Sequence, residues 1–145
     1  MKIFSISNQK GGVGKTTTSV NLAASLALNK QKVLLIDLDP QGNASSGAGI
    51  NKLTLDISIY ETLIGKVTIN DVVRAVEDNM FDIAPANQSL AGAEIEMVNI
   101  EHREYILKNS FKTLKKTYDY ILIDCPPALN LLTVNALAAS DSVII

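Results

Sequence analysis

Residues 10–17 read Lys10-Gly11-Gly12-Val13-Gly14-Lys15-Thr16-Thr17, and this stretch decides the fold. It directly follows the apolar segment Lys2–Ser7, which we expect to be a strand, and it opens the apolar segment Thr16–Asn29, which we expect to be a helix. Its three glycines let backbone N–H groups approach an anion, and the start of the helix adds about half a positive charge. A strand, a glycine-rich loop and a helix in this order predict a phosphate-binding loop.

The loop also carries the side chains that a nucleotide with Mg²⁺ requires. Lys15 can reach the β- and γ-phosphates as a point charge, and Thr16 can place its hydroxyl on Mg²⁺. Gln9 stands where the common form of this loop has its first glycine, and Lys10 follows it, which is typical of the deviant Walker A loop. We therefore expect the whole loop to bind ATP or ADP, through Lys10, Gly11, Gly12, Val13, Gly14, Lys15, Thr16 and Thr17.

Two aspartates follow further apolar runs and complete the expected site. Asp39 lies in Asp37–Asn43, directly after the expected strand Val33–Ile36, and is the candidate for orienting or activating the attacking water, with Asp37 as an orienting group behind it. An Asp-Pro and Gly-Asn turn is the simpler interpretation of this stretch taken alone. Asp124 ends the apolar run that begins at Tyr120, which is the Walker B pattern. We expect Asp124 to hold Mg²⁺ through water, so the predicted metal site comprises Thr16, Asp39 and Asp124.

Continuous apolar strands separated by helical segments predict a doubly wound, mostly parallel α/β fold of the P-loop NTPase type. The remaining expected strands are Phe81–Ala84, Tyr120–Ile123 and Ser142–Ile145. The remaining expected helices are Ile59–Ile64 with Ser58 as its cap, Thr68–Val76 with Asn70 or Asp71 near its start, Leu90–Asn99, Glu101–Thr117 and Asn130–Ala139. Because residues 1–145 end inside an expected strand, we expect them to be the N-terminal portion of one ATPase domain, truncated before the sheet is complete.

The net charge and the amino-acid composition argue against several classes of protein. A net charge of −2 and a pI near 5.3 argue against a surface that is basic throughout, as in many nucleic-acid-binding domains. We expect Lys112, Lys115 and Lys116 to lie on a solvated helix face rather than in a DNA-binding patch. Cys125, the single cysteine, excludes an internal disulfide and is expected to be buried, and the single His102 is expected on the surface. No signal peptide or membrane-length apolar run is found, so the expected location is the cytoplasm.

Taken together, Lys10–Thr17, Asp37–Asn43 and Asp124–Pro127 resemble the ParA/Soj/MinD superfamily of deviant Walker ATPases, and most closely the ParA/Soj partition proteins. The resemblance implies that Lys10 reaches across an ATP-dependent homodimer to the partner's nucleotide, that Lys15 is the ordinary phosphate-binding lysine, and that Asp39 orients water. It also implies that the dimer binds DNA without sequence preference, on the nucleoid and mostly through regions beyond residue 145. A ParB-type activator protein would stimulate hydrolysis, and the intrinsic ATPase activity would be weak.

Three alternatives remain open from the sequence. A MinD-like ATPase would act at the membrane, although the Gln41-Gly42-Asn43 continuation favours the partition branch. A redox protein of the nitrogenase iron-protein type would need cluster-ligating cysteines, and Cys125 alone fits this poorly. Residues 1–145 by themselves could also be an ordered half-domain that does not hydrolyse ATP.

Overall fold

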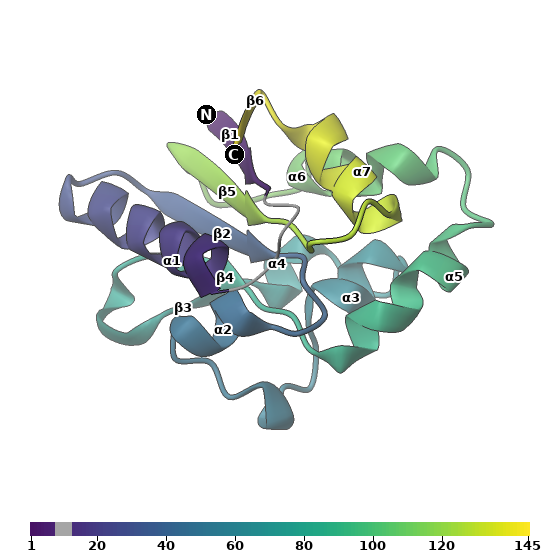
Figure 1. The fold of residues 1–145 in the computed structure, drawn as a ribbon, viewed down its shortest axis with the longest axis horizontal. Helices are drawn as coiled ribbons and strands as arrows, with labels where there is room; N and C mark the ends of the chain where they lie inside the picture. The colour runs from purple at the N-terminus through teal and green to yellow at the C-terminus, as the bar shows by residue number, and fades with distance from the viewer. Residues whose placement is uncertain (8–12) are drawn as a thin grey trace.

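The computed structural model describes the backbone of residues 1–7 and 13–145 and the side chains of residues 1–7, 18–78 and 80–145. Its centre is a six-stranded sheet with the strand order β3-β4-β2-β5-β1-β6 (Figure 1). All neighbouring strands are parallel except β3 and β4. The strands are β1 (Lys2–Ile6), β2 (Val33–Asp37), β3 (Arg74–Ala75), β4 (Asp82–Ala84), β5 (Tyr120–Asp124) and β6 (Ser142–Ile144). The expected doubly wound, mostly parallel α/β fold is confirmed, and five of these strands match the predicted ones.

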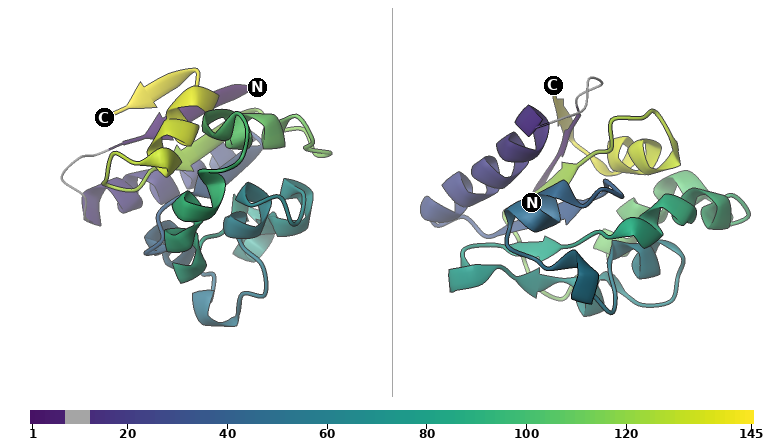
Figure 2. Two further views of the ribbon diagram at one scale, coloured as in Figure 1. Left: turned by 90° about the vertical axis from the view of Figure 1, so that its right-hand side faces the viewer. Right: turned by 60° about the horizontal axis from the view of Figure 1, so that its bottom comes forward.

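Helices cover both faces of the sheet. The right-hand view of Figure 2 shows α1 on one side of the strands and α7 with α5 and α6 on the other. The helices are α1 (Val13–Leu28), α2 (Asn43–Gly47), α3 (Ile59–Leu63), α4 (Ile69–Val72), α5 (Ala93–Met97), α6 (Ile106–Phe111) and α7 (Leu131–Ala139). Short 3₁₀ turns lie at Lys52–Thr54, Glu77–Asn79, Gln88–Gly92 and Arg103–Tyr105. No helix of the described residues is both long enough and apolar enough to cross a bilayer.

The core explains why the central strands are apolar without alternation. Along β2, Val33 and Leu35 pack in a cluster with Ala23 of α1 and Ala44 of α2. The residues between them, Leu34 and Ile36, pack in a second cluster with α3 to α7 on the opposite face. Successive side chains of a strand point to opposite faces, so a strand covered on both faces needs apolar residues at every position.

Side-chain caps fix the starts of α3 and α7, and the first of these caps, Ser58, was predicted. Ser58 caps α3 through a reciprocal bond pair with Glu61, and the side chain of Asn130 accepts a hydrogen bond from the N–H of Thr133 at the start of α7. The cap of α4 is Thr68, paired with Asp71, and Asn70 and Asp71 lie near the start of the helix as expected.

The predicted helix Thr68–Val76 was wrong in its second half. The helix ends after Val72, and Arg74–Ala75 instead form β3, antiparallel to β4. The N–H of Val76 donates to the carbonyl of Phe81 at 3.0 Å, which closes this hairpin. Pairing with a neighbouring strand has overridden the local helical preference, as tertiary context often does.

The predicted helix Glu101–Thr117 was also too long, because α6 ends at Phe111. The side chain of Asn70 donates to the carbonyl of Thr113 at 2.8 Å and accepts from the N–H of Lys115 at 2.9 Å. Backbone groups that would continue the helix are thus bonded to another element. The lysines at 112, 115 and 116 consequently do not share a helix face, which corrects that expectation.

Candidate functional site

The carboxyl ends of β2 and β5 bring two aspartates together. Asp37 and Asp124 are the last residues of these neighbouring parallel strands and lie opposite each other in the register. Both residues are fully buried. Helix α1 begins at Val13, after the segment that follows β1, so its N-terminus belongs to this same edge of the sheet. The edge therefore combines two carboxylates with the positive end of a helix.

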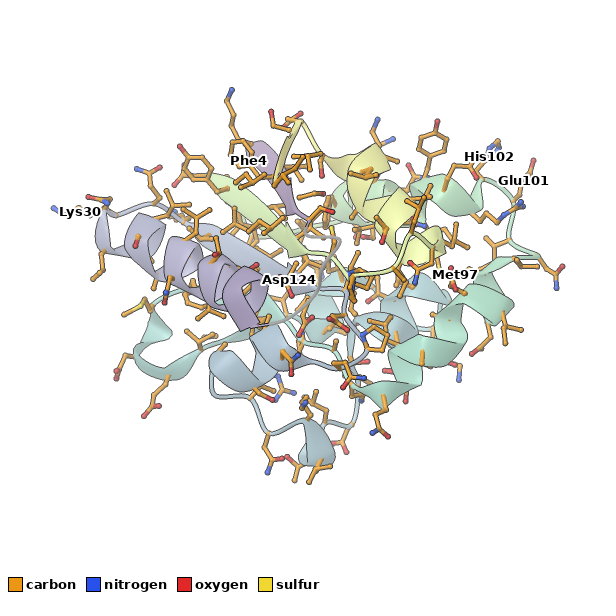
Figure 3. The ribbon with its side chains drawn as sticks, in the orientation of Figure 1. Phe4, Lys30, Met97, Glu101, His102 and Asp124 are labelled. Carbon is orange, nitrogen blue, oxygen red and sulfur yellow. The ribbon has the colours of Figure 1, made fainter. Side chains whose placement is uncertain are left out.

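Asp124 is tied directly to α1. The hydroxyl of Ser19, which is fully buried in the second turn of the helix, donates to Oδ1 of Asp124 at 2.6 Å. This bond sets the helix against the end of β5, near the centre of the ribbon in Figure 3. Ser19 was not among the predicted site residues. Nothing in the sequence singles it out, because the same helix carries further polar residues such as Thr18, Asn21 and Ser25.

Asp37 anchors the loop that carries Asp39. One carboxylate oxygen, Oδ1, accepts from the N–H of Asp39 at 3.0 Å, and the other accepts from the N–H and the hydroxyl of Ser45 at 2.9 and 2.7 Å. Burial, helped by the negative charge of Asp124, raises the pKa of Asp37 to about 7, although the hydrogen bonds from Ser45 and from the backbone act in the opposite direction. Asp37 thus holds the backbone of Asp39 in place, and its expected role as an orienting group in the site stays a prediction.

Ser45 links this loop to the end of β4. Its Oγ accepts a hydrogen bond from the N–H of Ala86 at 2.9 Å while donating to Asp37. Sequence reasoning missed Ser45, because its partners Asp37 and Ala86 are eight and 41 residues away along the chain. The loop after β2 is thus fixed from both sides by one buried hydroxyl.

Asp39 is buried and held in a tight turn. Its Oδ1 accepts from the N–H of Gln41 at 3.0 Å, and its carbonyl accepts from the N–H of Gly42 at 2.8 Å. The turn interpretation is therefore confirmed, and the carboxylate of Asp39 lies buried shortly after the end of β2, whereas its role toward water stays a prediction. A side chain restrained in this way can orient a small molecule such as water.

Gly42 permits this turn because its φ is +64°, a conformation that other residues adopt at a cost. A Cβ at this position would lie 2.4 Å from Cδ of Lys52 and 3.0 Å from the carbonyl oxygen of Ala86. The same lysine donates from Nζ to the carbonyl of Gln41 at 2.6 Å, so it cannot move away without losing that bond.

We expect Gly42→Ala to lower the free energy of unfolding by about 2–3 kcal/mol, through backbone strain and the clash with Ala86. Gly65→Ala is the matched control, because Gly65 has a φ of +83° but open space around it. It should cost only the strain, about 1 kcal/mol. Urea unfolding of both variants measures the difference, and equal losses would show that Lys52 and Ala86 accommodate the added methyl group.

The phosphate-binding loop lies mostly outside the described residues. Lys10, Gly11 and Gly12 are not described, and residues 13–17 are described only as the backbone of the first turns of α1. The helix begins at Val13, before the expected start at Thr16. The assignments of Lys10, Lys15, Thr16 and Thr17 to nucleotide contacts, and of Thr16, Asp39 and Asp124 to Mg²⁺, remain predictions.

Within the described part of the chain, no group of three or more His, Cys, Asp or Glu residues is placed to hold a metal ion. Cys125 is buried, as expected, and His102 is exposed, with 72% of its side chain accessible, as expected for a surface residue. Figure 3 places His102 beside Glu101, far from Asp124.

The chain is similar to proteins of a known family. The family described as "AAA domain" matches residues 1–145. The sporulation initiation inhibitor protein Soj of Bacillus subtilis is 54% identical over 144 residues, which are 99% of this chain and 57% of Soj.

Two solved structures are similar to this chain over nearly its whole length. The structure of cobyrinic acid a,c-diamide synthase from Mycobacterium smegmatis with a bound ATP analogue and magnesium superposes with a TM-score of 0.94 at 39% identity, covering 99% of this chain and 58% of that one. A plasmid partition protein from Borrelia burgdorferi bound to AMPPNP gives a TM-score of 0.88 at 41% identity, covering 98% and 59%. The chain thus spans somewhat more than half the length of Soj and of these two proteins. The match over residues 1–145 shows that the chain belongs to the AAA domain family, and the likeness to Soj places it among the ParA/Soj-type members that its motifs indicated.

Proposed function

We propose that the whole protein is a partition ATPase, in which residues 1–145 provide the nucleotide-binding part of one ATPase domain. The observation that carries this proposal is the meeting of Asp37, Asp124 and the N-terminus of α1 at one edge of the sheet. The glycine loop lies between β1 and α1 in the sequence, and phosphates bind where a helix N-terminus follows such a loop.

The residues at this edge fit a nucleotide with Mg²⁺. A carboxylate from Asp124 and a hydroxyl from Thr16 are hard oxygen ligands of the kind that Mg²⁺ takes, together with water and phosphate oxygens. Two buried carboxylates in register also repel each other, so a cation at this edge would be favoured. When bound, Mg²⁺ would neutralise charge on the phosphates. Two of the similar structures hold an ATP analogue or AMPPNP, one of them with magnesium, which supports this assignment.

We assign the side chains as follows. Lys15 binds the β- and γ-phosphates, and Lys10 reaches the nucleotide of a second subunit when ATP brings two subunits together. Asp39 orients the attacking water, and Asp37 with Ser45 holds the Asp39 loop in place. Asp124 positions the metal ion, with Ser19 keeping its carboxylate aligned on α1.

The biological role follows from the relatives rather than from the fold, because one fold supports many functions. Soj, at 54% identity, and the Borrelia plasmid partition protein, at 41%, support DNA partition. On this proposal the ATP-bound homodimer binds DNA without sequence preference on the nucleoid, in the cytoplasm, and a ParB-type partner stimulates hydrolysis. The biosynthetic role in the name of the Mycobacterium smegmatis protein is the competing candidate, supported by its TM-score of 0.94 but by a lower identity of 39%.

Sedimentation of the whole protein tests this proposal. We expect it to pellet with duplex DNA of unrelated sequence in the presence of ATP and not of ADP. Vesicles of anionic lipid serve as the second arm, because a MinD-like protein would pellet with lipid instead. A protein that hydrolyses ATP but ignores both DNA and lipid would overturn the partition role and favour a biosynthetic one.

A further inference from the structure

A lysine from the segment after α2 reaches back to the turn that carries Asp39. Lys52 begins the 3₁₀ turn Lys52–Thr54 and is partly buried, and its Nζ donates to the carbonyl oxygen of Gln41 at 2.6 Å. Its apolar stem lies against Gly42, because a Cβ added to this glycine would clash with Cδ of the lysine. The side chain of Lys52 therefore covers the outer surface of the turn and bonds to its backbone.

The carbonyl that Lys52 binds belongs to the peptide group that closes the turn. The carbonyl of Gln41 and the N–H of Gly42 share one planar peptide group. This N–H donates to the carbonyl of Asp39 at 2.8 Å, while the carbonyl accepts from Lys52. The N–H of Gln41 itself donates to Oδ1 of Asp39 at 3.0 Å. The backbone of one residue, Gln41, thus connects the ammonium of Lys52 to the carboxylate of Asp39.

This peptide group needs a restraint from outside the turn. Gly42 has a φ of +64°, and a glycine adopts positive and negative φ with similar ease. Rotation of the Gln41–Gly42 peptide group would break its bond to Asp39 and open the turn. Pro40 and Gln41 line a hollow of about 380 Å³, so packed side chains do not fully cover the turn on this side. The bond from Lys52 supplies a restraint there, and its positive charge strengthens it.

The segment around Lys52 is itself ordered by local hydrogen bonds. The side chain of Asn51 accepts from the N–H of Leu53 at 3.1 Å, and the hydroxyl of Thr54 donates to the carbonyl of Asn51 at 3.2 Å. A long lysine side chain loses conformational entropy when it is held in one position. Because the backbone of Lys52 is already fixed by these neighbours, only its side chain has to be ordered for the bond to form.

We propose that Lys52 is a positioning residue for ATP hydrolysis, which keeps the Asp39 carboxylate aligned through the Gln41–Gly42 peptide group. This inference rests on the proposed function, in which Asp39 orients the attacking water. Asp37 and Ser45 hold the buried side of the same loop, and Lys52 holds the side that faces the hollow. Because Lys52 acts on the turn and not on the nucleotide, its loss should slow hydrolysis without weakening ATP binding.

The test uses Lys52→Met in the whole protein, because methionine keeps an unbranched apolar stem over Gly42 but lacks the ammonium. We expect kcat to fall by about tenfold, since a small misplacement of the group that orients water slows the reaction, and the Kd for ATP to stay within about twofold. Lys52→Arg keeps a charged donor and should recover most of the turnover. Phosphate release at saturating ATP with Mg²⁺ gives kcat, and equilibrium binding of a fluorescent ATP analogue gives the Kd.

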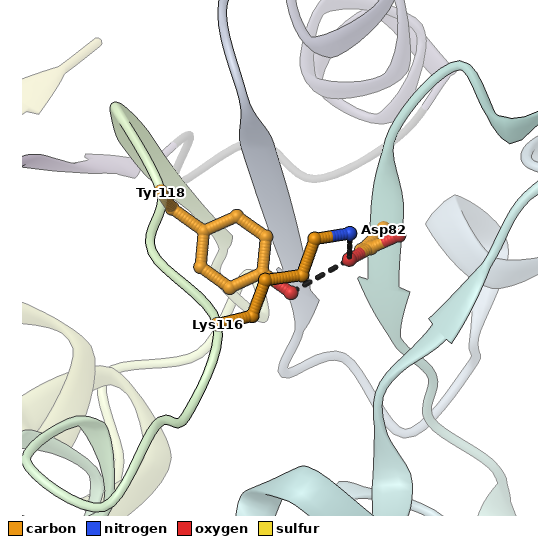
Figure 4. Close-up of polar contacts among 3 residues, drawn as sticks. All are labelled: Asp82, Lys116 and Tyr118. Atoms are coloured by element: carbon orange, nitrogen blue, oxygen red, sulfur yellow. Dashed lines mark hydrogen bonds and ion pairs between the residues drawn. The ribbon is translucent and has the colours of Figure 1, made fainter.

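Lys116→Met is the matched control, because this lysine makes a comparable bond away from the candidate site. Its Nζ donates to Oδ2 of Asp82 at 2.8 Å, and the hydroxyl of Tyr118 donates to the same oxygen at 2.7 Å (Figure 4). These residues lie at the amino-terminal ends of β4 and β5, whereas the candidate site lies at the carboxyl ends. The control removes one positive charge and one bond of a lysine, and its kcat should equal that of the parent. Equal losses of kcat in the two methionine variants would overturn the positioning role.

The double variant Asp39→Ala/Lys52→Met shows whether Lys52 acts through Asp39. We expect the same kcat as for Asp39→Ala alone, because the group that Lys52 positions is then absent. A further fall of about tenfold in the double variant would mean that the two residues act independently, and would refute the proposal. A weaker Kd for ATP in Lys52→Met with an unchanged kcat would make Lys52 a nucleotide contact instead.

The same measurements separate this inference from the function on which it rests. If Asp39→Ala is slow but Lys52→Met turns over ATP at the parent rate, the role of Lys52 is overturned and the proposed function stands. If Asp39→Ala itself hydrolyses ATP at the parent rate, the role proposed for Asp39 fails, and the positioning role of Lys52 fails with it.

Discussion

Lys15→Ala is expected to abolish measurable ATP binding by the whole protein. Lys15 stands in the first turns of α1, at the sheet edge that Asp37 and Asp124 share, and its ammonium is assigned to the β- and γ-phosphates. Each hydrogen bond to a charged group contributes about 1.5–3 kcal/mol, so losing the lysine should weaken the Kd by about 100-fold or more. Equilibrium binding of a fluorescent ATP analogue in Mg²⁺ measures this directly.

Two further variants test whether the loss of ATP binding comes from the ammonium group of Lys15. Lys66→Ala removes an exposed lysine from a loop far along the chain and should leave ATP binding unchanged. Lys15→Arg keeps the charge but replaces a compact ammonium by a planar fork, so it should rescue binding only in part. If Lys15→Ala binds the nucleotide as tightly as the parent, residues 10–17 are not the phosphate-binding loop, and the proposed function loses its basis.

The sequence predicts the parts of the fold that depend on neighbouring residues. The expected strands Lys2–Ser7, Val33–Ile36, Phe81–Ala84 and Tyr120–Ile123 form β1, β2, β4 and β5. The signal is strongest for β2 and β5, because a strand buried on both faces needs apolar residues throughout. The aspartates that end β2 and β5 can be placed together from the amino-acid sequence, since parallel strands end at a common edge. Caps such as Ser58 can also be predicted from the sequence, because its bonding partners Tyr60 and Glu61 lie within three residues along the chain.

Features that depend on contacts between residues far apart in the chain could not be predicted from the sequence. Helix α6 stops early because Asn70 binds backbone groups near residue 114, more than 40 residues further along the chain. Ser19 bonds to Asp124 across 105 residues, and nothing local marks it as part of the site.

Asp39→Ala is expected to separate ATP binding from hydrolysis. The carboxylate lies in a turn held by Gln41, Gly42 and the Asp37–Ser45 pair, so bonds within its own loop restrain it. Because it is assigned to orient water rather than to bind phosphate, its removal should lower kcat by about 100-fold or more and leave the Kd for ATP within about twofold. The ATP-bound state should then accumulate, and the variant should sediment as a dimer with ATP where the parent returns to a monomer as it turns over.

Asp39→Asn refines this test, because the amide keeps the turn acceptor for the N–H of Gln41 but removes the negative charge. If the charge of Asp39 acts on the water, Asp39→Asn should be as slow as Asp39→Ala. If Asp39 only shapes the loop, Asp39→Asn should recover most of the turnover, and the orienting role would pass to another group. Asp56→Ala, an exposed carboxylate outside the loop, controls for the loss of one negative charge and should hydrolyse ATP at the parent rate. A loss of ATP binding in Asp39→Ala would place this residue among the phosphate or metal contacts, so the comparison of Kd with kcat decides between the two roles that the geometry allows.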